Sequence, residues 1–254
     1  MIQTSEKRRY DAVLCDVDGC LSSEAGGPLD TTGMTRLAEY NRRAAEVGDR
    51  PFITLCTGRP VSYADCLSRL IDNLQLPVVA ENGVWLYHAG TNDWRIDPGI
   101  THEHLVAMRE LSDFIEETFG PDGVRLQPGK TASLSPYHED PEFLATVVDP
   151  IRAHCEERDY PIRVSPTWNY INCDLTFVSK RTGIARFQKW TGLGSDRLAG
   201  IGDTPSDLAI AESVACFAVP ANRNPELDSS AQIISEHAEL EGVLDILEHW
   251  VGVD

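Results

Sequence analysis

Acidic side chains occur in two short segments that lie far apart in this 254-residue chain. One segment is Asp16-Val17-Asp18-Gly19, and the other is Gly202-Asp203 followed four residues later by Asp207. Carboxylates brought close together repel each other, so such a group favours a hard divalent cation with oxygen ligands. Magnesium fits because it is usually held by one or two carboxylates, waters and a substrate phosphate. Asp16, Asp18, Asp203 and Asp207 are therefore the candidate metal ligands.

Two further segments could hold the other parts of a phosphate site. Thr57-Gly58-Arg59 supplies a hydroxyl, a close backbone approach and a cation, and Glu81-Asn82-Gly83 supplies an amide beside a turn. Phosphoryl transfer depends mainly on positioning and on neutralising charge. A carboxylate can act as the nucleophile through an aspartyl-phosphate. These residue types are typical of phosphoryl chemistry.

Short apolar runs precede each of these segments, and helical patterns separate the runs. The runs are residues 12–15, 52–56, 78–80 and 198–201. Strands that alternate with helices at this spacing indicate an α/β fold with a parallel, Rossmann-like sheet covered by helices on both faces. Ligands of such sheets bind beyond the carboxyl ends of the strands. We therefore expect the four segments to meet at one edge of the sheet.

The middle of the chain breaks this alternation. Residues 98–176 follow an αββαββ order, with strands at 124–127 and 131–135 predicted to pair around the turn Pro128-Gly129. We expect an inserted α+β domain there. The catalytic domain would then comprise residues 1–97 and 177–254.

Composition excludes several classes of protein. The formal net charge is −18, from 22 Lys and Arg against 40 Asp and Glu, and such a surface disfavours nucleic acids and anionic membranes. The same charge repels a phosphorylated substrate, so a phosphate site needs a metal, a lysine or backbone amides. The seven cysteines have no paired spacing, and the polar, charged residues 1–9 do not resemble a secretion signal. We expect a cytoplasmic protein with free thiols.

The segments also carry a resemblance to a known family. In chain order they, together with Lys180, resemble the four motifs of the haloacid dehalogenase-like superfamily. The insertion between the second and third motifs resembles the C2-type cap of that superfamily, which contributes to substrate specificity. Glu81-Asn82-Gly83 before the cap, and Val178-Ser179-Lys180 after it, resemble the Cof-type and sucrose-phosphatase-like branch.

The resemblance implies a role for each motif residue. Asp16 would attack phosphorus and ligate Mg²⁺, while Asp18 would protonate the leaving oxygen, activate water and contact the metal through its backbone carbonyl. Thr57 and Lys180 would hold the phosphoryl oxygens. Asp203 would ligate Mg²⁺, and Asp207 would support it.

Two positions depart from the pattern of the family. Cys20 stands where threonine is usual, and Ser206 where the branch commonly has asparagine. Neither change removes a nucleophile, an acid or a metal ligand.

Several residues keep two interpretations. Arg59 either caps its helix or binds substrate with Gly58, and Asn82 is either a turn residue or part of the site. Lys130 is either a solvated hairpin residue or a cap lysine that contacts substrate. Other possible specificity residues of the cap are His138, Trp168 and Tyr170.

Taken together, the sequence predicts a Mg²⁺-dependent phosphatase that hydrolyses a small phosphorylated metabolite, with a sugar phosphate as the favoured substrate. A phosphomutase or phosphotransferase of the same superfamily is an alternative, but the longer glycine-rich fourth motif of phosphomannomutases is absent. A non-catalytic phosphate-binding regulator is another, but such a protein would typically have lost Asp16, Asp18 or Lys180. The sequence specifies neither the substrate nor the oligomeric state.

Overall fold

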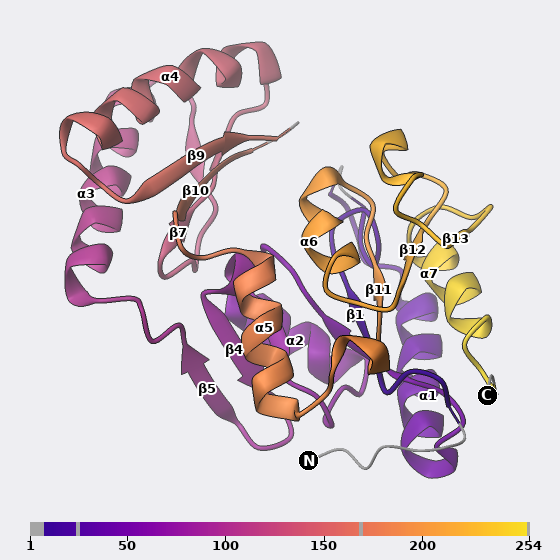
Figure 1. Ribbon diagram of the computed structural model, residues 1–254. Helices are drawn as coiled ribbons and strands as arrows, with labels where there is room; N and C mark the ends of the chain where they lie inside the picture. The colour runs from indigo at the N-terminus through magenta and orange to yellow at the C-terminus, as the bar shows by residue number, and fades with distance from the viewer. Residues whose placement is uncertain (1–7, 24–25, 168–169, 253–254) are drawn as a thin grey trace. The chain divides into compact units, whose positions relative to one another are not determined.

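The computed structural model describes residues 8–23, 26–167 and 170–252. The chain folds into two compact units (Figure 1). Unit 1 contains Met1–Arg95 and Lys180–Asp254, and unit 2 contains Ile96–Ser179.

The centre of unit 1 is a parallel sheet, as predicted, and it has five strands. Residues 78–80, which were expected to belong to it, form part of a second sheet and pair antiparallel there. The strand order of the five-stranded sheet is β13-β12-β11-β1-β2. The strands are β1 (Ala12–Cys15), β2 (Phe52–Leu55), β11 (Leu198–Ile201), β12 (Cys216–Val219) and β13 (Ile233–Ile234). In the central strand β1, Ala12 pairs with both Phe52 and Leu198. All four residues of β1 are buried, because helices cover both faces of the sheet.

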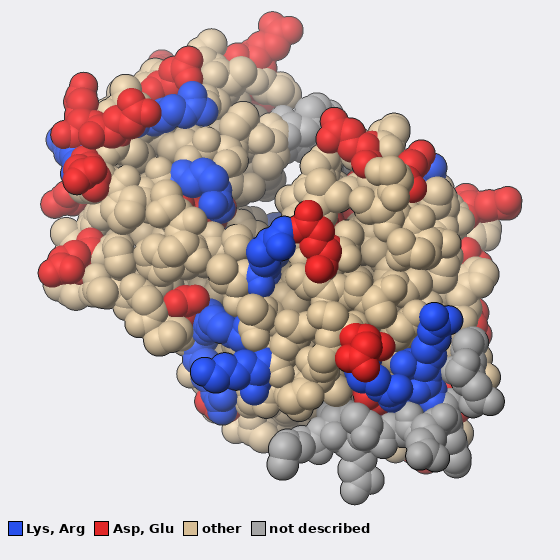
Figure 2. Space-filling view, viewed as in Figure 1, with Lys and Arg blue, Asp and Glu red and all other residues tan. Residues whose placement is uncertain are grey.

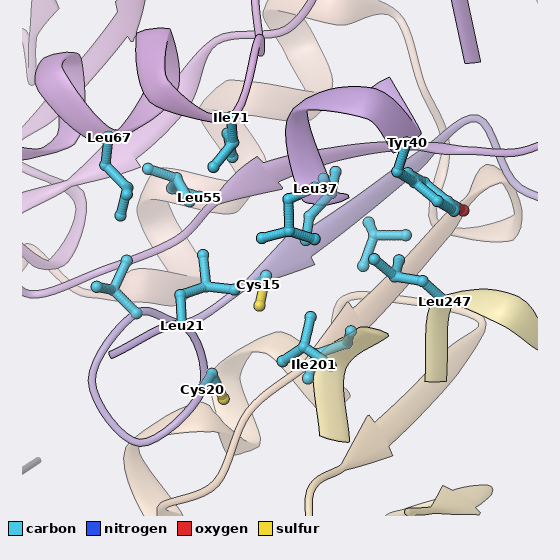
Figure 3. Packing of buried hydrophobic residues seen from close by; sticks show 14 of the residues in the cluster. Cys15, Cys20, Leu21, Leu37, Tyr40, Leu55, Leu67, Ile71, Ile201 and Leu247 are labelled. Carbon is cyan, nitrogen blue, oxygen red and sulfur yellow. The ribbon is translucent and has the colours of Figure 1, made fainter. Parts of the chain in front are cut away.

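Alternate residues of β1 face two different helix layers, as the period of two in a strand requires. Val13 and Cys15 belong to one hydrophobic cluster, and Ala12 and Leu14 belong to another. The first cluster includes residues of α1 (Thr31–Val47), α2 (Val61–Leu70) and α7 (Glu239–Glu248), as Figure 3 shows in part. The second includes residues of α5 (Lys180–Thr191) and α6 (Leu208–Ala211).

A second sheet of unit 1 continues from the edge of the first. It consists of β3 (Val78–Ala80), β4 (Trp85–His88) and β5 (Asp93–Ile96). A parallel bridge joins Cys56 to Val79, so the end of β3 lies beside the end of β2. Four short 3₁₀ helices in the described part of unit 1 are η1 (Glu81–Gly83), η2 (Ser195–Arg197), η3 (Pro205–Asp207) and η4 (Pro225–Leu227).

Unit 2 is an α+β domain. Its antiparallel sheet has the order β7-β10-β9. The elements are α3 (His102–Phe119), α4 (Pro141–Glu157), β6 (Arg125–Leu126), β7 (Ser133–Leu134), β8 (Pro136–Tyr137), β9 (Ile162–Pro166) and β10 (Ile171–Leu175). Acidic side chains gather over α3 and α4 in the view of Figure 2, so part of the large negative charge lies on this unit.

Residues 125–127 pair with the chain that follows the turn Pro128-Gly129, as predicted, but their partners are residues 135–137 and not residues 131–134. The strand β6 pairs with β8, whereas Ser133 and Leu134 of β7 pair with β10. Because residues 133–134 pair with β10, the chain returns toward β6 only at Ser135, whose carbonyl accepts from the backbone N–H of Gln127 at 3.0 Å.

No helix within the described residues is both long enough and apolar enough to cross a membrane.

Candidate active site

Three carboxylates from two loops meet at the carboxyl edge of the parallel sheet. Asp16 directly follows β1, and Asp203 lies two residues beyond β11, the strand that pairs with β1. One oxygen from each of Asp16, Asp203 and Asp207 lies within 4.8 Å of the others. All three side chains are buried. The adjacent strand ends therefore bring together acids that are almost 190 positions apart in the sequence.

Lys180 lies between two of these acids. Its Nζ is 3.0 Å from Oδ1 of Asp16 and 2.7 Å from Oδ1 of Asp207. Burial alone would lower the pKa of Lys180, but Asp16 and Asp207 outweigh it and hold that pKa well above its usual value. The ammonium group therefore stays charged at neutral pH within the acidic group.

The carboxyl group of Asp16 has a perturbed pKa. Burial is the largest cause and the nearby Asp207 the second, and together they raise the pKa of Asp16 from 3.8 to about 7 although Lys180 opposes them. A strong shift of this kind in a carboxylate beside other titratable groups is typical of functional sites.

Asp207 is used mainly to hold its own loop. Its Oδ2 accepts hydrogen bonds from the backbone N–H of Asp203 and of Thr204, both at 3.1 Å, and its Oδ1 accepts from Lys180. These bonds fix the backbone of Asp203 against the start of η3. The structure thus gives Asp207 supporting contacts to the other groups of the site.

The turn after Asp16 packs directly against Asp203. Gly19 has a φ of +79°, and a Cβ at this position would lie 2.0 Å from Oδ2 of Asp203. Cys20 is fully buried, with its Sγ 3.8 Å from Oδ1 of Asp203. Glycine is therefore required at position 19, and the thiol that replaces the usual threonine contacts the carboxylate of Asp203.

Asp18 is held by Arg59. The Nε of Arg59 donates to both carboxylate oxygens of Asp18, at 3.0 and 2.8 Å, and the guanidinium also lies over the ring of Tyr63. The carboxylate of Asp18 is not among the three that converge. Arg59, a candidate substrate-binding residue, thus lies against the candidate acid/base.

Thr57, Gly58 and Asn82 form one interlocked turn. Thr57 is fully buried, and its Oγ1 accepts from the backbone N–H of Arg59 at 3.0 Å. The backbone N–H of Asn82 donates to the Thr57 carbonyl at 3.0 Å, and the Asn82 side chain lies against Gly58. Glu81 and Asn82 both have a φ of +52°. Two consecutive non-glycine residues in this region store strain, which is common at functional sites.

The candidate residues of the insertion lie in unit 2. Nζ of Lys130 donates to Oγ of Ser135 at 2.6 Å. His138 interacts with the backbone carbonyls of Asp122 and Asp140, and Tyr170 bridges to Tyr137. Trp168 lies outside the described residues.

One residue with contacts at this site was missed from the sequence. Asn222 follows β12, and its Nδ2 donates to the carbonyl of Gly19 at 2.8 Å. The segments predicted from strand ends follow β1, β2, β3 and β11. Applied to β12, the rule that ligands bind beyond strand ends would have drawn attention to Asn222.

The group formed by Asp16, Asp203 and Asp207 fits a magnesium ion in its chemistry. All its donors are carboxylate oxygens, which suit a hard cation. Their crowding in a buried place costs free energy that a divalent cation would offset. Asp16 and Asp203 would hold the ion, and Asp207 would orient Asp203.

Comparisons with known proteins agree with this fold. No family model matches the chain. The phosphoglycolate phosphatase of Methanosarcina acetivorans is 22% identical over 244 residues, which cover 94% of this chain and 96% of that protein. That of Methanothrix thermoacetophila is 29% identical over 102 residues, 40% of this chain and 46% of that protein.

Solved structures show the same architecture. A haloacid dehalogenase-like hydrolase from Bacteroides thetaiotaomicron matches with a TM-score of 0.71 at 13% identity, covering 94% of this chain and 99% of that chain. The sucrose-phosphatase of Synechocystis, solved with sucrose and phosphate, matches with a TM-score of 0.61 at 17% identity, covering 95% and 98%. The chain therefore has the fold of the haloacid dehalogenase-like hydrolases, and the resemblance predicted from its motifs is confirmed at the level of the fold.

Proposed function

We propose that this protein is a phosphoric monoester hydrolase that depends on Mg²⁺ and acts on a small phosphorylated metabolite. The observation that carries the proposal is the buried group of three carboxylates, two of which contact the ammonium of Lys180. A relative named as a phosphatase, matched over 94% of this chain, supports the same reaction class.

In the first step, an Oδ atom of Asp16 attacks phosphorus and the bond from phosphorus to the leaving oxygen breaks. Asp18 gives a proton to that oxygen, and the product is an aspartyl-phosphate on Asp16. In the second step, Asp18 takes a proton from water, the water oxygen attacks phosphorus, and the bond from phosphorus to the Asp16 oxygen breaks, which releases phosphate and restores the Asp16 carboxylate. Bound Mg²⁺ would supply positive charge against the phosphoryl oxygens.

The other residues neutralise and orient. Lys180 places its ammonium beside the nucleophile, and Thr57 offers a hydroxyl to the phosphoryl group. Arg59 holds the carboxylate of Asp18 in one position through its paired hydrogen bonds. The proposed substrate-binding set remains Gly58, Arg59, Asn82 and Lys130.

The substrate is proposed as a class. The relatives named above carry the name phosphoglycolate phosphatase, and a structural neighbour is a sucrose-phosphatase. A small phosphorylated acid therefore joins the sugar phosphate as a candidate, and we propose that unit 2, as the cap, distinguishes them. All seven cysteines are free, which fits a reducing, cytoplasmic location.

The test is release of phosphate from a panel containing phosphoglycolate, sugar phosphates and nucleotides, with and without Mg²⁺. Hydrolysis should require Mg²⁺, stop with a chelator and be lost in Asp16→Asn. The matched control is Asp149→Asn, which makes the same chemical change at an exposed acid of α4 that pairs with Arg152 on the same helix. Full activity of Asp16→Asn would refute the assigned nucleophile. Isomerised sugar phosphate without free phosphate would indicate a mutase, and binding without turnover a regulator.

A further inference from the structure

Asn222 connects the nucleophile turn to the start of a helix. Its Nδ2 donates to the carbonyl of Gly19 at 2.8 Å, and its Oδ1 accepts from the backbone N–H of Glu239 at 2.8 Å. Glu239 is the first residue of α7, and its φ is +51°. The side-chain amide of Asn222 thus accepts a hydrogen bond from the helix and donates one to the nucleophile turn.

The geometry of Gly19 gives this bond a consequence for the site. The backbone N–H of Gly19 donates to the carbonyl of Ser22 at 2.7 Å, and its carbonyl is held by Asn222. With both of its peptide groups bonded, Gly19 stays in its left-handed conformation with its Cα against the carboxylate of Asp203.

The same bonds orient the preceding peptide. A trans peptide is planar, so its C=O points opposite to its N–H. Fixing the N–H of Gly19 toward Ser22 therefore fixes the direction of the Asp18 carbonyl, which is the proposed backbone contact of the metal. Loss of the bond from Asn222 would free one end of Gly19 and loosen both Asp203 and this carbonyl.

We propose that Asn222 is a positioning residue for the magnesium site, acting through Gly19 and not through contact with the substrate. The proposal rests on the proposed function for its catalytic consequence. Its effect on metal binding can be measured separately. A side chain that orients metal ligands in this way commonly changes metal affinity or activity by about 10-fold to 100-fold when it is removed.

Asn222→Asp separates the two bonds. A carboxylate can still accept from the N–H of Glu239 and suits a helix N-terminus, but it has no proton to donate to Gly19. Asn222→Ala removes both bonds. We therefore expect Asn222→Asp to retain the melting temperature of the wild type, while Asn222→Ala lowers it.

The charge control is Asn224, which lies in the same loop and contacts the carbonyl of Asp203 only through its backbone N–H, a bond that a side-chain substitution leaves in place. The Oδ1 of Asn224 accepts from the backbone N–H of Glu226 at 2.9 Å and so caps η4. Asn224→Asp adds the same charge and keeps its cap, because aspartate is as good a cap as asparagine.

The experiment measures the Kd for Mg²⁺ by calorimetry, together with kcat and KM on the best substrate of the panel. Asn222→Asp should raise the Kd about 10-fold or more and lower kcat by a similar factor, with Asn224→Asp within about twofold of the wild type. Equal Kd values in Asn222→Asp and Asn224→Asp would overturn the proposal. If the wild type binds Mg²⁺ but hydrolyses nothing, the proposed function fails while the Kd comparison still decides the role of Asn222. A wild type that binds no Mg²⁺ would overturn both.

Discussion

Replacing Gly19 with alanine should damage the metal site by a predictable amount. The left-handed conformation costs a non-glycine residue about 1–2 kcal/mol, and the φ of Gly19 is +79°. In a protein of this size, that cost corresponds to a fall in melting temperature of roughly 2–8 °C.

The new methyl group adds a second, local effect. It would lie 2.0 Å from Oδ2 of Asp203, whereas real Cβ atoms essentially never lie closer than 3.0 Å to another atom, so the carboxylate must move by about 1 Å or more. Magnesium demands near-ideal ligand distances of about 2.0–2.1 Å, and a ligand displaced this far no longer meets them. We therefore expect the affinity for Mg²⁺ to fall at least about 10-fold.

Gly192 provides the matched control. Its φ is +77°, and a Cβ there would meet nothing within 4 Å. Gly192→Ala should therefore lose similar stability but bind Mg²⁺ as the wild type does. Thermal unfolding in chelator and calorimetric titration with Mg²⁺ measure the two effects. Unchanged Mg²⁺ affinity in Gly19→Ala would refute the contact between Gly19 and Asp203 as a determinant of the site.

Three further predictions concern buried titratable groups. Lys180→Met leaves Asp16 and Asp207 buried without their cation, so the free energy of unfolding, measured by urea titration in chelator, should fall by about 3–5 kcal/mol. Added Mg²⁺ should restore part of this loss. A Lys180→Met variant as stable as the wild type in chelator would contradict the ion pairs. Because the pKa of Asp16 is raised to about 7, Mg²⁺ must displace a proton from Asp16 when it binds below that pH. The affinity for Mg²⁺ should therefore rise with pH up to about 7 and then level off. Equal Kd values by calorimetry at about pH 5.5 and pH 8 would count against this. Burial lowers the pKa of His154 below 6.5, so as the pH falls His154 is protonated in the unfolded chain before it is protonated in the folded protein. The contribution of His154 to the free energy of unfolding should therefore be fully present above about pH 6.5 and decrease below it. His154→Phe should remove this decrease from acid unfolding curves, and a curve unchanged by the substitution would contradict the prediction.

Much of unit 1 could be predicted because buried parallel strands are almost continuous apolar runs. The strand before Asp16 and the strand before Gly202 were predicted at the residues where they lie. The strand ends then brought Asp16 and Asp203 to one edge of the sheet without any knowledge of distances.

The pairing of polar groups could not be predicted in the same way. The bond from Asn222 to Gly19 spans 203 positions, and no local pattern marks its two ends as partners. The ion pair of Asp18 with Arg59 is a similar case, because spacing placed both at the edge but not against each other. In unit 2, two-residue strands such as β6 and β8 carry too few side chains for a period of two to identify their partners.

The most direct test of the central claim is to locate the phosphoryl group on the protein during turnover. Asp18→Asn, which lacks the proposed acid/base, should be incubated with Mg²⁺ and substrate, quenched in acid and digested for mass spectrometry. The account predicts a phosphorylated peptide with the modification on Asp16, and none in Asp16→Asn. Phosphate release by the wild type without any phosphorylated Asp16, or with the phosphoryl group on another residue, would contradict it.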